Sequence, residues 1–170
     1  MTSPTLVIVS GRPGTGKTTL AHQLAARIGA PAICRDEIKE GMAHASPDFV
    51  PARGDFLTRR TFTTFFEVLR TLLSAGVSVV GEAAFQGNVW RPNLEPLDQL
   101  GTIKVIRCNL DESVRQARIA SRPRRPSHVD PATHHEAEFE HLGSPYPMQT
   151  VDTAEGYNPG LQMLVDFINQ

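Results

Sequence analysis

A glycine-rich segment near the start of the chain, residues 11–18, constrains the fold more than any other feature. Its sequence GRPGTGKT has the spacing G-x-x-x-x-G-K-[ST], in which glycines let a loop turn its amide groups inward. The β-branched run before it, residues 5–10, predicts a short buried strand. After it, apolar side chains recur every four residues and predict a helix: Leu20, Leu24 and Ile28. A strand, such a loop and a helix in this order are typical of a phosphate-binding site.

This loop can make three kinds of contact with a polyphosphate. The amide groups and the positive end of the helix attract phosphate oxygens, Lys17 reaches the β- and γ-phosphates, and the Thr18 hydroxyl can ligate Mg²⁺. The alternative is an ordinary glycine turn with an incidental lysine. We expect ATP and Mg²⁺ as cofactors, bound by Gly11, Pro13, Gly14, Thr15, Gly16, Lys17, Thr18 and Thr19.

The remainder of the 170-residue chain alternates short apolar runs with amphipathic stretches. Further strands are predicted at residues 31–34, 77–82, 102–108 and 150–152. Helices are predicted at residues 36–42, 62–73, 94–100, 111–121, 133–141 and 161–168. This alternation predicts a three-layer α/β sandwich with a parallel sheet of about five strands. We expect one domain over residues 1–170, with an arginine-bearing helical lid over approximately 111–141.

Composition limits what such a domain can do. The chain is 40% hydrophobic and 21% charged with a net charge of −1, which favours neither disorder nor a surface that coats nucleic acid. Cys34 and Cys108 each end an apolar run, so we expect buried free thiols, and no metal-ligand spacing is evident. The start, MTSPTLVIV, has no basic leader and too short an apolar run to cross a bilayer. We therefore expect a cytoplasmic protein without membrane contact.

Two carboxylates follow predicted strands and are candidate catalytic residues. Asp36 comes just after the second strand, beside Arg35, at the sheet edge where such folds bind ligands. It can position an acceptor hydroxyl and take its proton as a bond to phosphorus forms, although capping of the next helix is an alternative. Glu82 ends the third strand, where it can hold Mg²⁺ or position the acceptor, unless it is an ordinary solvated strand end.

A group of arginines stands out in a chain of slight negative charge. Its members are Arg115, Arg118, Arg122, Arg124 and Arg125. The first three share one face of a predicted helix, which suggests a lid that closes over phosphates. We expect Arg118 to contact phosphate and Arg122 to neutralise charge in the transition state. For the last two a solvated basic surface is the better interpretation, as is simple exposure for His128.

Aromatic residues supply weaker evidence. Phe49, Phe85 and Trp90 fall in or beside predicted loops at the active edge of the sheet, where they could line an acceptor pocket. Core packing explains them equally well. One stripe of a predicted helix is expected in the core: Phe62, Phe65 and Phe66.

Five segments together resemble one group of P-loop kinases, which are AAA-type ATP-binding enzymes. The segments are GRPGTGKTTLAHQLA, ICRDEIKEG, VVGEAAF, CNLDESVRQARIASRPR with His128, and VDT before the last helix. The group contains chloramphenicol phosphotransferase, zeta-toxin-like kinases and the kinase domain of bacteriophage polynucleotide 5′-kinase. The resemblance implies a P-loop NTPase fold in which Lys17 and Thr18 bind phosphate and Mg²⁺ and Asp36 activates the acceptor.

The same resemblance has implications for the lid and the base. It implies that Arg118 and Arg122 contact ATP phosphates or adenine, and that the segment around Thr153 and Ala154 borders the adenine. Between residues 41 and 60, where acceptor specificity is expected, no feature identifies a substrate.

We expect a kinase that transfers the γ-phosphate of Mg·ATP to a hydroxyl of a small molecule held by Arg35 and Asp36. An antibiotic, a sugar or a nucleoside-like metabolite fits this description. The main rival is a polynucleotide 5′-hydroxyl kinase, which needs a basic channel, and no basic stripe is evident outside the lid. A third hypothesis is a nucleotide-binding switch, but the N-K-x-D motif of guanine-specific switches does not occur.

Overall fold

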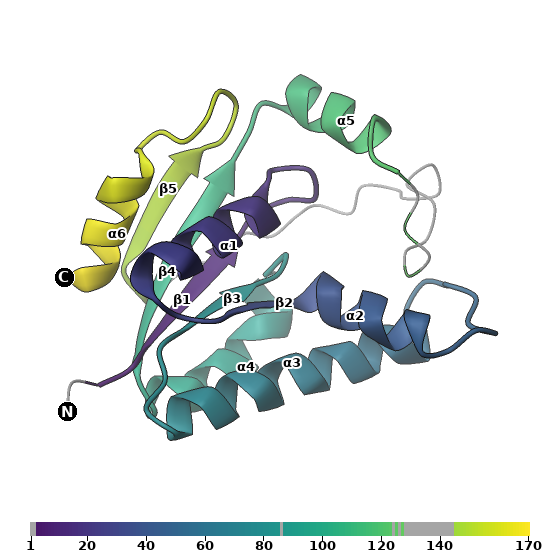
Figure 1. Ribbon diagram of the computed structural model, residues 1–170, viewed down its shortest axis with the longest axis horizontal. Coiled ribbons are helices and arrows are strands. Elements are labelled where there is room, and N and C mark those ends of the chain that lie inside the picture. The colour runs from purple at the N-terminus through teal and green to yellow at the C-terminus, as the bar shows by residue number, and fades with distance from the viewer. Residues whose placement is uncertain (1–2, 86, 124, 126, 128–144) are drawn as a thin grey trace.

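The computed structural model of the chain describes residues 3–85, 87–123, 125, 127 and 145–170. Arg124, His128 and the helix predicted over residues 133–141 lie outside these residues. The described chain forms a five-stranded parallel sheet between two layers of helices, as predicted (Figure 1). The strands are β1 (Thr5–Ser10), β2 (Ala32–Cys34), β3 (Val79–Glu82), β4 (Thr102–Asn109) and β5 (Met148–Asp152). The helices are α1 (Lys17–Ile28), α2 (Arg35–His44), α3 (Phe56–Ser74), α4 (Gly87–Asp98), α5 (Glu112–Ala120) and α6 (Leu161–Asn169).

β1 lies at the centre of the sheet, whose strand order is β2-β3-β1-β4-β5. Leu6 and Ile8 pack on one side of the sheet, Val7 and Val9 pack on the other, and all four are fully buried. Burial on both faces explains why β1 reads as an uninterrupted apolar run. The chain passes from β1 through α1 to β2 and then β3 on one side of β1, and it crosses to β4 and β5 on the other side. Sheets of this type bind ligands where the strand order diverges in this way.

Two helices cover one face of the sheet, with Phe65 and Leu69 from α3 and Leu94 from α4. α3 begins at Phe56, earlier than predicted, because the Asp55 side chain accepts a hydrogen bond from Thr58 N and caps the helix. On the other face, α1 and α6 pack on the sheet through Leu20, Leu24, Leu164 and Ile168.

The prediction for α4 is wrong in extent. The helix was expected over residues 94–100, yet it spans Gly87–Asp98 although it contains Pro92 and Pro96. Proline removes a backbone donor, but the buried stripe of Trp90, Leu94 and Leu97 keeps this helix packed on the sheet.

The same packing determines where the aromatic side chains of this region lie. Phe85 is fully buried and Trp90 is 5% exposed, and their ring centroids lie 4.5 Å apart within the core. Core packing is therefore the role that the structure gives them. Cys34 and Cys108 are buried and free, as predicted.

The carboxyl ends of three strands are in register. Glu82 of β3 lies beside Val9 of β1 on one side and beside Cys34 of β2 on the other. β1 then passes into the glycine loop, and β2 passes directly into α2. Three chain segments from distant parts of the sequence therefore meet at one edge of the sheet, and β5 ends close by, beyond β4.

Within the part of the chain that the structure describes, no helix has the length and apolarity needed to cross a membrane. α3 has 19 residues but carries charged side chains along its exposed face: Arg59, Arg60, Glu67 and Arg70.

Candidate active site

The glycine loop between β1 and α1 has the tight backbone that its sequence predicts. Gly14 and Gly16 have φ of 91° and 79°, values that residues with a side chain rarely adopt. Gly16 is also the N-cap of α1, so the amide groups at the start of this helix face the loop. A Cβ atom on Gly14 would lie 2.9 Å from Cγ of Arg115, which shows how closely α5 packs on the loop.

Hydrogen bonds from within the loop and from the segment after β5 hold its backbone in place. The Thr15 hydroxyl donates to the carbonyl of Arg12 at 2.9 Å. The hydroxyl of Thr153, after β5, donates to the carbonyl of Thr15 at 2.8 Å and to that of Asn109 at 3.3 Å. Thr153 was expected to bind nucleotide, and its buried hydroxyl supports the backbone of the glycine loop.

A buried carboxylate stands beside the loop. The hydroxyl of Thr18 donates to Oε2 of Glu82 at 3.0 Å, and Nζ of Lys17 lies 3.8 Å from Oε1. Glu82 is 3% exposed, so it is not a solvated strand end. Burial raises its pKa, the charge of Lys17 lowers it, and the charge of Asp36 raises it, with a raised pKa as the net result. The hydroxyl and carboxylate oxygens match the hard ligands that Mg²⁺ prefers, so this pair fits the predicted ion.

Asp36 comes two residues after Cys34, which pairs with Glu82 in the sheet, and the charge of Asp36 raises the pKa of Glu82. Cys34 is the N-cap of α2, so Asp36 sits in the first turn and is not the cap. Its Oδ1 accepts a hydrogen bond from Nη1 of Arg35 at 3.1 Å, and its side chain is 40% exposed. Nε of Arg35 is buried, and among the described residues no group accepts a hydrogen bond from it. Arg35 thus has donor capacity to offer a ligand beside Asp36.

Arg115 has a structural position that its sequence spacing does not reveal. It is 3% exposed and donates to the carbonyl of Pro13 in the glycine loop at 3.1 Å. Its guanidinium also pairs with Glu112, which in turn contacts Arg12 at 3.0 Å. Hydrogen bonding from Arg115 is the main reason that the pKa of Glu112 falls to about 2. Arg115 therefore fastens α5 to the loop.

Arg118 lies in α5, and Arg122 follows shortly after the end of this helix. Nη2 of Arg118 donates to the carbonyls of Thr153 and Ala154, and its Nη1 lies beside Gly16, 3.8 Å from where a Cβ would stand. Burial lowers the pKa of Arg122, while the charges of Asp36 and Glu82 raise it. These two carboxylates are therefore close enough to Arg122 to act on it.

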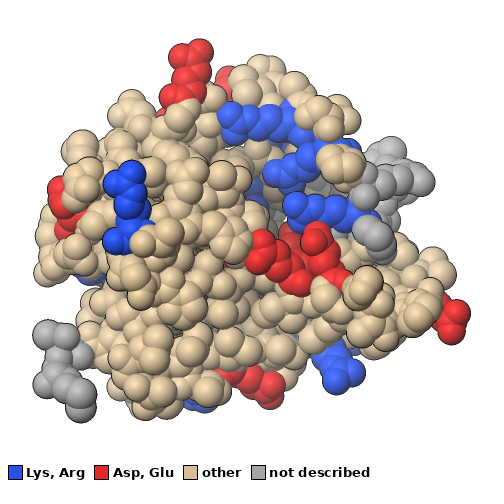
Figure 2. All heavy atoms as spheres, in the orientation of Figure 1, with Lys and Arg blue, Asp and Glu red and all other residues tan. Residues whose placement is uncertain are grey.

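The two sides of this region carry opposite charge. Figure 2 shows basic side chains gathered below α5 and acidic side chains opposite them at the start of α2. An ion pair joins the two sides, with Nη1 of Arg125 3.0 Å from Oε1 of Glu40. Arg125 was expected to be merely solvated. This contact instead draws the segment after α5 toward α2.

Two cavities lie away from these charges. The larger, of about 510 Å³, is lined by residues such as Glu95, Thr102 and Tyr146 at the opposite end of the sheet. The smaller, of about 280 Å³, lies over the loop after α2 and is lined in part by Phe49 and Phe56, whose rings meet edge to face at 5.8 Å. Phe49 is the aromatic residue that remains a candidate acceptor contact.

The parallel sheet, the glycine loop after β1 and the buried carboxylate that ends β3 together define a P-loop nucleotide-binding protein with a kinase-like fold. Residues 6–141 match the family described as "AAA domain", and the chain belongs to this family. No match is found among curated proteins.

Solved structures of kinases share the fold. A protein from Chloroflexus aurantiacus, described provisionally as a kinase, is 25% identical with a TM-score of 0.81, over 100% of this chain and 96% of that chain. A sugar kinase from Janibacter sp. HTCC2649 is 18% identical with a TM-score of 0.66, over 99% and 95%. An APS kinase from Mycobacterium tuberculosis, in complex with AMPPNP and APS, is 14% identical with a TM-score of 0.66, over 100% of each chain.

Proposed function

We propose that the protein is a phosphotransferase that moves the γ-phosphoryl group of Mg·ATP to a hydroxyl of a small molecule. The observation that carries this proposal is the meeting of Lys17, Glu82 and Asp36 at the carboxyl ends of β1, β3 and β2. The P-loop kinase-like fold and the similarity to kinases support the reaction type.

The loop and α1 bind the phosphates in this proposal. The amide groups at the start of α1 face the β- and γ-phosphates, and Nζ of Lys17 leaves the carbonyl of Arg12, 3.4 Å away, to pair with them. Thr18 and Glu82 hold the magnesium ion through oxygen atoms. Mg·ATP supplies the transferable phosphoryl group and neutralises part of its charge.

Asp36 acts on the acceptor. Its exposed carboxylate orients the acceptor hydroxyl and takes the proton as the new oxygen–phosphorus bond forms, while the bond to ADP breaks. The partly exposed guanidinium of Arg35 binds a polar group of the same molecule. Arg118 and Arg122 approach the phosphates from the α5 side and exclude water from the site.

The test is transfer of labelled γ-phosphate from ATP to a panel of hydroxylated antibiotics, sugars, nucleosides and a 5′-hydroxyl oligonucleotide. Wild type is compared with Asp36→Asn, and Asp166→Asn, which changes an exposed acid of α6, is the matched control. We expect label on a small molecule in wild type and the control, and its loss in Asp36→Asn without loss of ATP binding.

Three other results would change this interpretation. Label on the oligonucleotide would favour a polynucleotide kinase, and Asp36 would keep its role. Full transfer by Asp36→Asn would move acceptor activation to another residue, with Glu82 as the next candidate. ATP binding with no transfer to any acceptor or to water would contradict the kinase proposal and favour a nucleotide-binding switch.

A further inference from the structure

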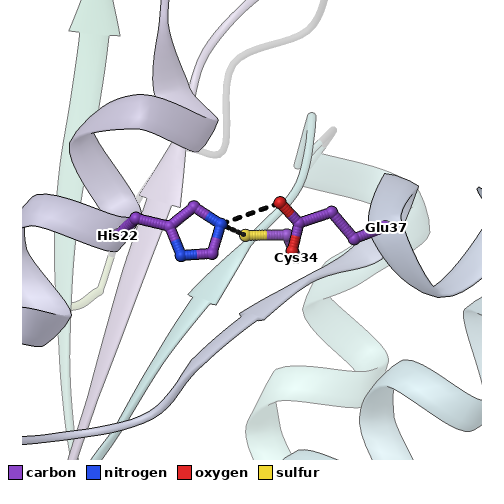
Figure 3. Close-up of side chains that lie close together, drawn as sticks. All are labelled: His22, Cys34 and Glu37. Atoms are coloured by element: carbon purple, nitrogen blue, oxygen red, sulfur yellow. Dashed lines mark hydrogen bonds and ion pairs between the residues drawn. The ribbon is translucent and has the colours of Figure 1, made fainter.

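Three side chains with different donor atoms meet where α1, β2 and α2 come together (Figure 3). His22 comes from α1, Cys34 ends β2, and Glu37 lies in the first turn of α2. Nε2 of His22 lies 2.7 Å from Oε1 of Glu37 and 3.7 Å from Sγ of Cys34. The three donor atoms all lie within 4.8 Å of one another, and no other group of this kind is found among the described residues.

These separations fit a metal ion placed between the donor atoms. Tetrahedral zinc, with bonds of about 2.0–2.3 Å to nitrogen, oxygen and sulfur, holds its ligand atoms about 3.3–3.6 Å apart. The 3.7 Å between nitrogen and sulfur already fits, and the short contact of His22 with Glu37 needs only a small side-chain rotation on the surface.

The position of the cluster allows an ion to enter. Cys34 is 2% exposed and forms the floor, while the His22 and Glu37 side chains are 50% and 46% exposed and form the rim. Three protein ligands leave a fourth position that faces solvent and can hold water. The rim residues come from two different helices, so an ion here would join them.

The kind of donor atom selects the kind of metal. Imidazole nitrogen and thiolate sulfur bind zinc well, whereas Mg²⁺ and Ca²⁺ need oxygen ligands, of which this cluster has one residue. The site is thus chemically distinct from the Thr18 and Glu82 pair, which offers oxygen alone. Burial and the neighbouring carboxylates of Glu82 and Glu37 raise the pKa of the Cys34 thiol, so this sulfur is protonated until a cation displaces the proton.

We propose that His22, Cys34 and Glu37 form a zinc-binding site that fastens α1 to the junction of β2 and α2. Binding forms a zinc–sulfur bond at Cys34 and releases the thiol proton to the buffer. The ion replaces the hydrogen bond between His22 and Glu37. The site thereby joins the helix that begins at Lys17 to the helix that carries Asp36.

The experiment measures zinc affinity of the tag-free, metal-depleted chain by competition with a chromophoric chelator in millimolar Mg²⁺. The test variants are His22→Ala, Cys34→Ser and Glu37→Gln. The matched controls are Cys108→Ser, which removes the other buried thiol, and His44→Ala, which removes an exposed histidine of α2. Cobalt absorption in the wild type tests Cys34 without any mutation, because only a thiolate ligand gives a sulfur-to-cobalt charge-transfer band.

We expect one zinc ion per chain in wild type and both controls, unaffected by Mg²⁺. Removal of a side chain that only hydrogen-bonds to a metal ligand costs roughly 10–100-fold in metal affinity. Each test variant lacks a ligand itself, so its zinc affinity should fall by more than this. Zinc should raise the melting temperature of wild type and not of Cys34→Ser. Absence of stoichiometric binding, a cobalt spectrum without the sulfur band, or unchanged affinity in Cys34→Ser and Glu37→Gln would overturn the site and leave a hydrogen-bonded cluster.

Discussion

Glu82 is the residue at which opposing electrostatic effects meet. Its carboxylate is almost completely removed from water, and the charge of Asp36 disfavours its ionised form further. Lys17 and the hydroxyl of Thr18 offset only part of this cost, so the pKa of Glu82 stays above its ordinary value. A raised carboxylate pKa is typical of a site that a cation completes, because the cation supplies the positive charge that stabilises the ionised carboxylate.

This balance predicts a pH dependence of stability. Because the pKa of Glu82 is higher in the folded than in the unfolded chain, its stabilising contribution is complete below about pH 4.5 and declines as pH rises through the folded value. Glu82→Gln removes this titration. We expect the melting temperature of Glu82→Gln minus that of wild type to become more positive from pH 4 to pH 8.

Glu67→Gln, which changes an exposed acid of α3, is the control for Glu82→Gln and should show no such trend. A difference between Glu82→Gln and wild type that is independent of pH would show that Glu82 has the same pKa in both states.

Single residues were predictable where their partners are local or where they end a strand. The glycine loop is contiguous, so the positions of Lys17 and Thr18 followed from its spacing. Arg115 and Arg118 have the same spacing pattern, but only the packing of α5 on the loop shows that one is buried on Pro13 and the other lies beside Gly16. His22, Cys34 and Glu37 form a cluster through the packing of α1 on β2, which no local spacing indicates.

At the scale of elements, α5 and the segment directly after it supply two arginines with separate roles. Arg118 in α5 donates to carbonyls after β5. Arg122 lies beyond the end of α5, where burial lowers its pKa and the charges of Asp36 and Glu82 raise it. We expect Arg122→Ala to lower kcat for phosphate transfer by about 10³ with little change in ATP affinity, because its charge is needed mainly in the transition state. Arg118→Ala should mainly weaken ATP binding. Steady-state kinetics with calorimetric ATP titration distinguish these effects, and equal losses of affinity in both variants would contradict the division.

The start of α3 depends on an ion pair that is almost completely buried. Nζ of Lys39 lies 3.0 Å from Oδ2 of Asp55 and also donates to Thr58, and the two charged side chains are 7% and 6% exposed. Asp55 is also the helix cap. This arrangement fastens the loop after α2, where acceptor specificity was expected, to the body of the protein.

Removal of Asp55 should therefore cost more than loss of a cap. We expect Asp55→Ala to reduce the free energy of unfolding by about 3–5 kcal/mol, because Lys39 is left buried without its counter-ion. Asp111→Ala, at the exposed cap of α5, should cost about 1 kcal/mol. Urea denaturation measures both values. Equal losses of unfolding free energy in the two variants would show that water reaches Lys39 in Asp55→Ala.

Elements were predicted best where apolar periodicity is uninterrupted. β1, α1 and α6 begin within one residue of the sequence expectation because their buried stripes are continuous. The start of α4 was misjudged because Pro92 suggests a break, and only the burial of the helix against the sheet shows that it tolerates this proline. Phe85 lies between β3 and α4, and Trp90 lies in α4; both pack against Phe65 of α3, a contact that no local pattern predicts.

At the scale of the whole molecule, both charged sides of the site lie across the carboxyl ends of the strands. The acids on α2 attract the arginines after α5, and the contact of Arg125 with Glu40 joins the two sides. A polyphosphate with its metal would enter this region and pair with both sides. The folded state should therefore gain stability from Mg·ATP over the entire molecule.

We expect the chain to unfold in one cooperative transition whose midpoint rises with Mg·ATP. At a ligand concentration 100 times Kd, linkage gives about 2.7 kcal/mol, and a chain of this size gains about 2–4 °C per kcal/mol, so the rise should be about 5–10 °C. Differential scanning calorimetry measures it.

Lys17→Ala should melt as one unit without this rise, because Lys17 contributes charge to the phosphates and little to the core. Arg27→Ala, at the exposed end of α1, is the matched control and should respond as wild type does. An equal rise in Lys17→Ala would place the nucleotide elsewhere, and two separate transitions would show that the chain does not fold as a single domain.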